Sequence, residues 1–226
     1  EAVEYVDTPE FDAVMSTAVM SLPADRCFVS HNDNRSFHFD ESRVLDRQLG
    51  CPVVFAQPEY AALLPQLRAA GSKIVFDLGW SEDLSLGQYS QILAQVDYFT
   101  PNDKEAAKLT GAASPEESLI VLERYVPHPI ISCGADGCLA RIDGAVYQIA
   151  PPPGIRSIDT TGAGDNFMSG LIFGLYHGLP LLDCLKIAVV TGSLSTTAPG
   201  CYGCAYTLDQ VMTHVPAVTV KNRTQS

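Results

Sequence analysis

The stretch Asp159-Thr160-Thr161-Gly162-Ala163-Gly164-Asp165 decides how the rest of the chain is interpreted. The four residues before it, Ile155 to Ile158, predict a short strand, and the apolar residues after it recur with helical spacing from Phe167 to Tyr176. The pattern therefore predicts a strand, a glycine turn and a helix. Glycines permit backbone angles and close approaches that a Cβ would forbid. Because a helix points unpaired N–H groups and its positive dipole end at such a turn, we predict an anion site there.

Asp165 adds chemistry to this anion site. A carboxylate in the first helical turn is stabilised in its charged form, and beside a bound phosphate it can accept a proton from an attacking hydroxyl. The stretch thus predicts phosphoryl transfer to an alcohol. The structural alternative is a helix start that is merely favourable, which is the commoner meaning of an isolated Gly-x-Gly-Asp. A dinucleotide fingerprint is disfavoured because Phe167 stands where a third small residue is needed, and the Walker pattern is absent from the chain.

Composition narrows the class of protein. The chain has 226 residues, 46% of them hydrophobic, and a net charge of -12. This predicts one sizeable core and argues against a nucleic-acid or anionic-membrane partner. Without a signal peptide or an apolar run near the about 20 residues of a membrane span, we expect a cytoplasmic enzyme. The seven cysteines are an odd number that suggests a reducing compartment, and Cys201-x-x-Cys204 lacks the second pair that zinc would need.

Strand and helix patterns alternate from residue 43 onward. Strands are expected at 52–56, 73–77, 98–100 and 130–132, and helices at 43–48, 59–70, 88–96, 102–110 and 115–125. This alternation predicts an α/β fold with a mainly parallel sheet, helices on both faces, and ligands beyond the carboxyl ends of the strands. Two hairpins are also expected, one at 17–30 followed by a polar loop at 31–36, the other at 138–149 around Asp143-Gly144.

Two further motifs follow predicted strands. Asn102-Asp103-Lys104-Glu105 has the spacing of a capping box, and its Asn and Glu can also hold Mg²⁺ through bound waters. The two roles are compatible. In Ser132-Cys133-Gly134-Ala135-Asp136-Gly137, the glycines can let the backbone approach a nucleotide, although a tight turn alone explains them equally well.

Together and in this order, the three motifs resemble those of the carboxyl-terminal two thirds of a PfkB (ribokinase-like) carbohydrate kinase. The resemblance runs from about Thr17 to Thr207. It implies a ribokinase-like α/β fold with a small β lid, and transfer of the γ-phosphate of ATP to a hydroxyl of a sugar or a related polyol or nucleoside. Residues 1–42 would belong to the lid and the substrate side, and residues 43–226 would form the nucleotide-binding and catalytic core. By this resemblance, the amino-terminal region that usually precedes the lid in the family would lie outside the residues matched here.

The resemblance also assigns roles to residues. Asp165 would be the general base, and the anion hole would consist of the N–H groups of Gly162, Ala163 and Gly164. The Mg²⁺ motif would be Asn102 and Glu105, acting mainly through water, and the nucleotide-binding residues would be Ser132, Gly134, Gly137 and, in the loop around the adenine, Gly200. A monovalent cation such as K⁺ would lie near Asp159 and Thr161.

The partners implied are a sugar-like substrate and a second copy of the chain, joined through the β lid. The rival interpretation is a catalytically silent sugar- or nucleotide-binding regulatory protein on the same fold. A second rival, an NAD-dependent enzyme on a doubly wound sheet, conflicts with Phe167.

Overall fold

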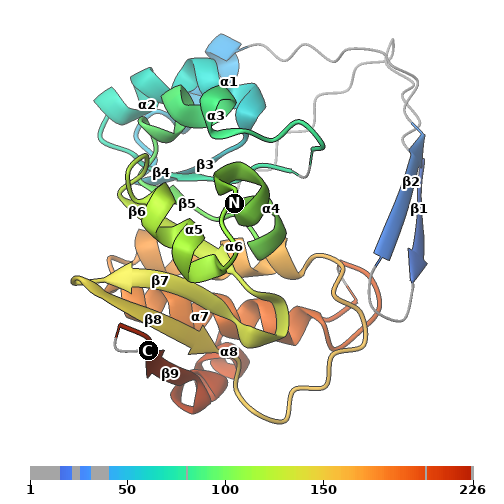
Figure 1. Ribbon diagram of the computed structural model, residues 1–226. Coiled ribbons are helices and arrows are strands. Elements are labelled where there is room, and N and C mark those ends of the chain that lie inside the picture. The colour runs from blue at the N-terminus through green and yellow to red at the C-terminus, as the bar shows by residue number, and fades with distance from the viewer. Residues whose placement is uncertain (1–15, 22–25, 32–40, 80, 202, 225–226) are drawn as a thin grey trace. The chain divides into compact units, whose positions relative to one another are not determined.

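The computed structural model describes residues 16–21, 26–31, 41–79, 81–201 and 203–224 (Figure 1). The chain divides into two compact units, 1–44 and 45–226. In the smaller unit, β1 (Ser16–Ser21) and β2 (Arg26–His31) pair antiparallel, which confirms the hairpin predicted at 17–30. From residue 32 onward, the predicted polar loop at 31–36 lies outside the described residues.

The larger unit contains a sheet of seven strands in the order β3-β4-β5-β6-β7-β8-β9. Its parallel half consists of β3 (Val53–Ala56), β4 (Lys73–Phe76), β5 (Tyr98–Phe99) and β6 (His128–Ser132). Its antiparallel half consists of β7 (Cys138–Ile142), β8 (Ala145–Ala150) and β9 (Thr219–Asn222). The sheet is therefore mixed, and the expectation of a mainly parallel sheet holds only for its first half.

Short connections explain the change of direction. Residues 133–137 join β6 to β7, and a connection of that length cannot make the crossover that parallel neighbours require. Between β7 and β8, Asp143 and Gly144 have φ values of 50° and 84°. Two consecutive left-handed residues are the geometry of a type I′ hairpin turn, so the predicted Asp-Gly turn is confirmed.

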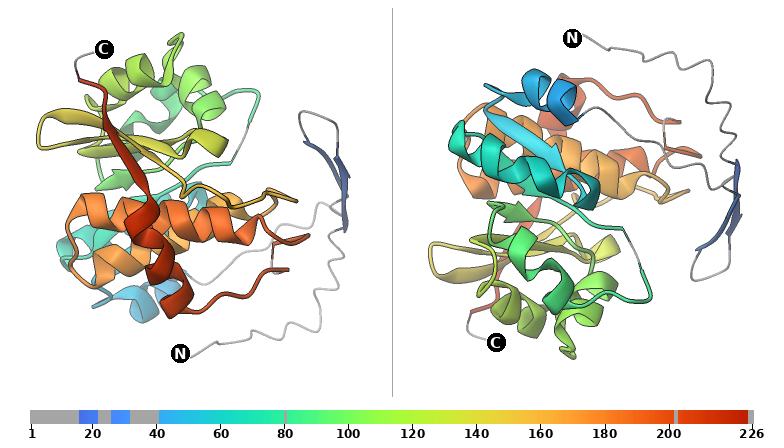
Figure 2. Two further views of the ribbon diagram at one scale, coloured as in Figure 1. Left: turned by 90° about the horizontal axis from the view of Figure 1, so that it is seen from below. Right: turned by 90° about the horizontal axis from the view of Figure 1, so that it is seen from above.

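Helices precede, connect and follow these strands. They are α1 (Glu41–Gln48), α2 (Leu64–Ala69), α3 (Leu86–Leu93), α4 (Asp103–Thr110), α5 (Pro115–Leu122), α6 (Ala163–Tyr176), α7 (Leu181–Ser195) and α8 (Leu208–His214). Short 3₁₀ turns cover Pro58–Leu63, Gly134–Asp136 and Val215–Ala217. Figure 2 shows α6 and α7 on one face of the sheet and α4 and α5 on the other.

The core lies between these layers. On the face covered by α6 and α7, Val75, Ile130 and Ile149 form one buried cluster with Leu171 and Ala188. Successive strand residues point to opposite faces, so the neighbouring fully buried residues point toward the helices of the other face. These residues are Ile74, Phe76 and Ile131. Because both faces of the central strands are buried, polar chemistry is confined to the ends of the strands.

Glycines bring α6 and α7 into close contact. A Cβ at Gly170 would lie 2.8 Å from Cα of Ala188, and a Cβ at Gly174 would lie 2.8 Å from Cα of Cys184. At the start of α6, Phe167 is buried against Gly192 of α7. The large ring that argued against a dinucleotide fingerprint therefore packs between two helices. This packing fixes the position from which α6 begins.

The strand predicted at 155–158 is wrong. In the described chain, residues 151–158 form a loop, and Ile158 is 64% exposed. Three consecutive prolines, Pro151 to Pro153, lack the N–H groups that a ladder requires, and Gly154 follows with φ of 88°. The amides of Ile158 and Asp159 donate instead to the carbonyl of Thr196, at 2.7 and 3.1 Å. The glycine turn is therefore attached to the end of α7 and not to a strand.

Candidate functional site

The glycine turn leads directly into α6. Gly162 occupies the N-cap position with φ of 78° and without a side-chain cap. The amide of Ala163 donates to the carbonyl of Thr160 at 3.2 Å. For the next two amides, those of Gly164 and Asp165, the described residues offer no backbone acceptor. Since Gly164 and Asp165 are both exposed, an anion can reach these two N–H groups.

Gly162 is required for two reasons. Its φ lies in the left-handed region that favours glycine. In addition, a Cβ at this position would lie 2.9 Å from Cα and 3.0 Å from Cβ of Cys201. The turn is therefore in direct contact with the loop that follows α7. At Gly164, by contrast, a Cβ would meet no atom within 4 Å.

Asp159 is hydrogen-bonded to two other predicted site residues. Its Oδ1 accepts from the amide of Thr161 at 2.9 Å and from the Thr161 hydroxyl at 2.7 Å. Its Oδ2 accepts from the amide of Gly200 at 2.8 Å. The structure thus brings Asp159, Thr161 and Gly200 together, although the sequence separates Asp159 from Gly200 by 41 positions.

Asn102 and Glu105 form a complete capping box at the start of α4. The Asn102 Oδ1 accepts from the Glu105 amide at 2.9 Å, and Glu105 Oε2 accepts from the Asn102 amide at 2.9 Å. Glu105 is only 6% exposed. Burial raises the pKa of its carboxyl group, and the hydrogen bonds from Asn102 act in the opposite direction. The predicted cap is confirmed, while the role of the pair in binding Mg²⁺ stays a prediction.

The start of α4 lies next to the turn predicted to bind the nucleotide. Asn102 pairs with Ser132 in an isolated parallel bridge, and the Ser132 amide donates to the carbonyl of Pro101 at 3.0 Å. In the turn itself, Gly134 has φ of 54° and open space beside it. Gly137 differs, because a Cβ there would overlap the Ile149 carbonyl oxygen of β8. Gly137 is thus required by the packing of the sheet.

Asp77 is a candidate site residue that the sequence patterns did not predict. It follows β4 directly, and its Oδ1 accepts from the Leu78 amide at 2.9 Å. Burial raises its pKa to about 7, with further upward contributions from the charges of Glu105 and Asp165. Glu105 and Asp165 therefore each act electrostatically on the carboxyl group of Asp77. The available signal is an aspartate at the carboxyl end of a buried strand, where ligand-binding residues of such sheets lie.

This arrangement suits a divalent cation. Magnesium is usually held by one or two carboxylates together with waters and substrate phosphates. Buried carboxylates with raised pKa values gain most from a nearby positive charge. No cluster of three or more His, Cys, Asp or Glu side chains that could hold a metal directly occurs among the described residues. The donor set therefore fits a cation bound mainly through water.

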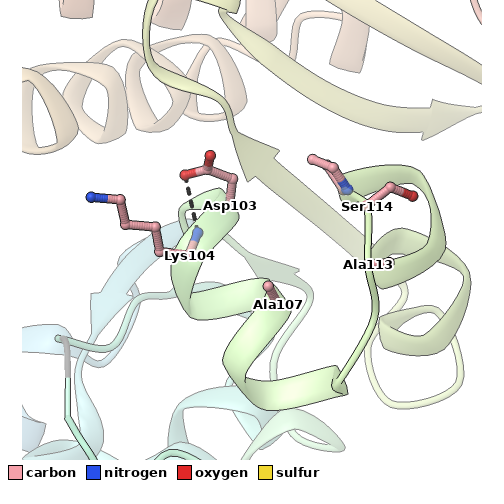
Figure 3. A pocket seen from close by; sticks show the side chains of 6 residues that line it. Asp103, Lys104, Ala107, Ala113 and Ser114 are labelled. Carbon is pink, nitrogen blue, oxygen red and sulfur yellow. Dashed lines mark hydrogen bonds between the residues drawn. The ribbon is translucent and has the colours of Figure 1, made fainter. Parts of the chain in front are cut away.

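A shallow groove lies beside this region (Figure 3). Its volume is about 220 Å³, and it is lined by the first turns of α4 and α5, with Asp103, Lys104, Ala107, Ala113, Ser114 and Pro115. Asp103 Oδ1 accepts from the amide of Lys104 at 3.0 Å, the bond drawn in Figure 3. None of the predicted site residues lines this groove, so it is adjacent to the site and not part of it.

Comparison with known proteins identifies the family. The sequence profile described as pfkB family carbohydrate kinase matches residues 52–208. This chain belongs to the PfkB family. The ribokinase of Lactococcus lactis subsp. lactis is 36% identical over 108 residues, which cover 48% of this chain and 35% of that enzyme. Across the curated relatives, the matched part is 34–51% of the relative's own length.

Solved structures show the same fold. The Arabidopsis thaliana ribokinase, solved with ribose and ATP, has a TM-score of 0.75 at 20% identity and matches 90% of this chain and 70% of its own. The Escherichia coli phosphofructokinase-2, solved with potassium, has a TM-score of 0.63 at 19% identity over 78% of this chain and 61% of its own. The ribokinase-like α/β fold is therefore confirmed. In the part of the PfkB chain that the structure describes, the helices are too short or too polar to cross a membrane.

Proposed function

We propose that this PfkB chain is the catalytic part of an ATP-dependent sugar kinase that phosphorylates a hydroxyl of a sugar or a related polyol or nucleoside. The observation that carries the proposal is the start of α6. There Gly162 supplies no side-chain cap, two amides stay open, and the carboxylate of Asp165 stands beside them. Because the matched part is 34–51% of the curated relatives, the activity is assigned to the full-length protein.

In the proposed reaction, the oxygen of the acceptor hydroxyl attacks the γ-phosphorus of ATP in line, the bond to the bridging β–γ oxygen breaks, and ADP leaves. The hydroxyl proton passes to Asp165. The resemblance implies an anion hole of the Gly162, Ala163 and Gly164 amides; in the proposed reaction the amides of Gly164 and of Asp165 donate to the charge on the transferring group. Each such donor is typically worth a factor of about 10² to 10³ in rate. Ala163 contributes mainly through its bond to Thr160, which supports the shape of the turn.

The nucleotide would bind along the neighbouring turn. Ser132 pairs with Asn102 in the isolated bridge, and Gly134 has open space beside its Cα, and both features support a phosphate-binding role. Gly200 is held by Asp159 beside the glycine turn, which supports its place in the nucleotide loop. When bound, Mg²⁺ would neutralise charge on the phosphates. Asn102 and Glu105 would hold it through water, and Asp77 would add its charge.

We propose that Asp159 and Thr161 help to hold a monovalent cation near the anion hole. Support comes from the potassium in the E. coli phosphofructokinase-2 structure and from the bond between Asp159 and the Gly200 amide. Turnover should then be faster in potassium chloride than in tetramethylammonium chloride at equal ionic strength. Equal rates in the two salts would remove the cation from the proposal.

The hairpin of β1 and β2 would act as the lid over the sugar and pair two copies of the chain. Support comes from the hairpin itself, since two strands by themselves leave both outer edges open to a partner strand. Sedimentation of the full-length protein should show a dimer. A profile with only monomer at high concentration would contradict this pairing.

The central test is ADP release by the full-length protein with Mg-ATP and a panel of sugars, polyols and nucleosides. Asp165→Asn should lower acceptor-dependent kcat by about 10² to 10⁴, because the base is lost while the helix start is kept. Asp183→Asn is the matched control, since Asp183 lies in the first turn of α7 and pairs with Lys186 at 3.0 Å. It should leave kcat unchanged.

Two outcomes would favour other functions. If no acceptor gives turnover while ATP or a sugar still binds, the chain is a binding or regulatory protein on the kinase fold. If Asp165→Asn and Asp183→Asn lower kcat equally, Asp165 acts only as a favourable helix terminus, and the base must be sought elsewhere.

A further inference from the structure

Asn166 follows the proposed base, and the proposed reaction does not use it. Its side-chain Nδ2 donates to the carbonyl of Gly162 at 2.9 Å, and its Oδ1 accepts from the hydroxyl of Tyr206. The orientation of the amide follows from its partners, because the Gly162 carbonyl can only accept and so must face the NH₂ group. The backbone of Asn166 is hydrogen-bonded as well. Its amide donates to the carbonyl of Gly162 at 3.0 Å, and its carbonyl accepts from the hydroxyl of Thr191 at 2.8 Å.

The bond to Gly162 acts on the geometry of the anion site. The carbonyl of Gly162 and the amide of Ala163 belong to one planar peptide group, so holding the carbonyl fixes the direction in which α6 begins. That direction determines where the amides of Gly164 and Asp165 point. Glycine by itself would not maintain it, since a residue without Cβ enters and leaves the left-handed region freely.

Tyr206 gives this contact a rigid anchor. The half-buried tyrosine packs against Ile187, Val190 and Val211, which belong to α7 and α8. Burial raises the pKa of its hydroxyl, so the hydroxyl stays protonated and able to donate at neutral pH. The loop after α7 therefore holds the glycine turn at two points. Gly200 binds Asp159 at one end, and Tyr206 binds Asn166 at the other.

We propose that Asn166 and Tyr206 are a positioning pair for phosphoryl transfer, in which Tyr206 orients the Asn166 amide and Asn166 holds the Gly162 peptide so that the two open amides point at the transferring group. Neither side chain needs to touch the substrate. The catalytic half of this inference rests on the proposed kinase function. The mechanical half, the restraint on the turn, does not.

The kinetic test uses the full-length protein with Asn166→Ala, Tyr206→Phe and the double variant. Asn166→Ala should lower kcat by about 10- to 100-fold with KM values for both substrates nearly unchanged, because displacements within about 1 Å matter at the reacting centre and not for substrate binding. Tyr206→Phe should lower kcat less. In the Asn166→Ala background it should add nothing, since Tyr206 acts through Asn166. Tyr176→Phe, at the far end of α6, is the matched control and should leave kcat unchanged.

The mechanical test is hydrogen–deuterium exchange of the peptide that covers residues 158–167. Asn166→Ala should speed exchange there several-fold, Tyr206→Phe should speed it less, and Tyr176→Phe should not change it. This readout decides the restraint even if the full-length protein has no kinase activity, so the two proposals can fail separately. The positioning pair is overturned by unchanged exchange in both Asn166→Ala and Tyr206→Phe. It is also overturned if Tyr206→Phe lowers kcat in the Asn166→Ala background by the same factor as in the wild type.

Discussion

Two helices, α4 and α6, begin near the carboxyl ends of the parallel strands. They differ in whether side chains accept hydrogen bonds from their first backbone amides. At the start of α4, the side chain of Asn102 accepts a hydrogen bond from the backbone amide of Glu105, and the side chain of Glu105 accepts one from the backbone amide of Asn102. At the start of α6, Gly162 has no side chain to offer, and the amides of Gly164 and Asp165 stay open. Both helices have the same dipole. The proposed anion site at α6 thus depends on an unsatisfied helix start, whereas the capped start of α4 could bind a ligand only through its remaining side-chain atoms.

The largest effect should come from giving the open helix start a side chain. Gly162→Ala places a Cβ against the backbone of Cys201 and imposes φ of 78° on an L-residue. We expect kcat to fall by about 10³ or more, because both anion-hole donors move. Gly71→Ala is the control, since Gly71 has φ of 88° with nothing within 4 Å. It should cost about 1 kcal/mol in the free energy of unfolding and leave kcat unchanged. Equal loss of activity in both variants would mean that strain and not the site explains the effect.

A smaller effect is expected at the capped start. Glu105→Gln keeps a side chain that completes a capping box but removes the charge. The Mg²⁺ concentration for half-maximal rate should rise by about 10- to 100-fold, with the free energy of unfolding unchanged or slightly higher. Ser114→Ala provides the matched control, because Ser114 caps α5 through a 3.2 Å bond from the Glu117 amide. It should cost about 1 kcal/mol of stability without any change in the Mg²⁺ requirement. An unchanged Mg²⁺ requirement in Glu105→Gln would leave Glu105 with a purely structural role.

The smallest effect concerns pH and stability. The pKa of Asp77 is raised from 3.8 to about 7 by burial and by the charges of Glu105 and Asp165. The folded protein therefore binds a proton that the unfolded chain releases, and this contribution to stability is full below pH 4 and is lost as the pH rises through 7. Asp77→Asn should remove that dependence, so its Tm should exceed that of the wild type at pH 8 by several degrees and approach it at pH 4.

Melting curves between pH 4 and pH 8 provide the measurement. Added Mg²⁺ should raise the wild-type Tm more at pH 8 than at pH 5, because the cation favours the ionised carboxylates. Parallel Tm profiles for the wild type and Asp77→Asn would show that folding does not raise the pKa of Asp77.

Local patterns predicted the features that depend on neighbouring residues. The capping box at Asn102, the Asp143-Gly144 turn and the glycine turn before α6 are all set by contacts a few positions apart, and the structure contains each of them. The alternation of strands and helices likewise predicted the α/β class. It did not predict that the sheet becomes antiparallel after β6, because strand direction depends on the length of each connection.

Features that depend on distant contacts were missed. The helix α7 was not predicted, since residues buried on nearly all sides give no single apolar stripe. The pKa of Asp77 depends on burial by the whole fold, and the bond between Asn166 and Tyr206 joins residues 40 positions apart. The strand predicted at 155–158 does not form because Pro151 to Pro153 lack the N–H groups that a strand ladder requires.

Gly164 is a glycine that the fold itself does not require. Its φ is not in the left-handed region, and a side chain there would meet no protein atom within 4 Å. Alanine should therefore be more stable in this helical position by up to about 1 kcal/mol. A laboratory screen for heat resistance would favour Gly164→Ala, whereas a screen for turnover would reject it if a phosphate must approach the backbone there. If the screen for heat resistance selects alanine at position 164 and the screen for turnover selects glycine, stability and activity place opposite requirements on this residue.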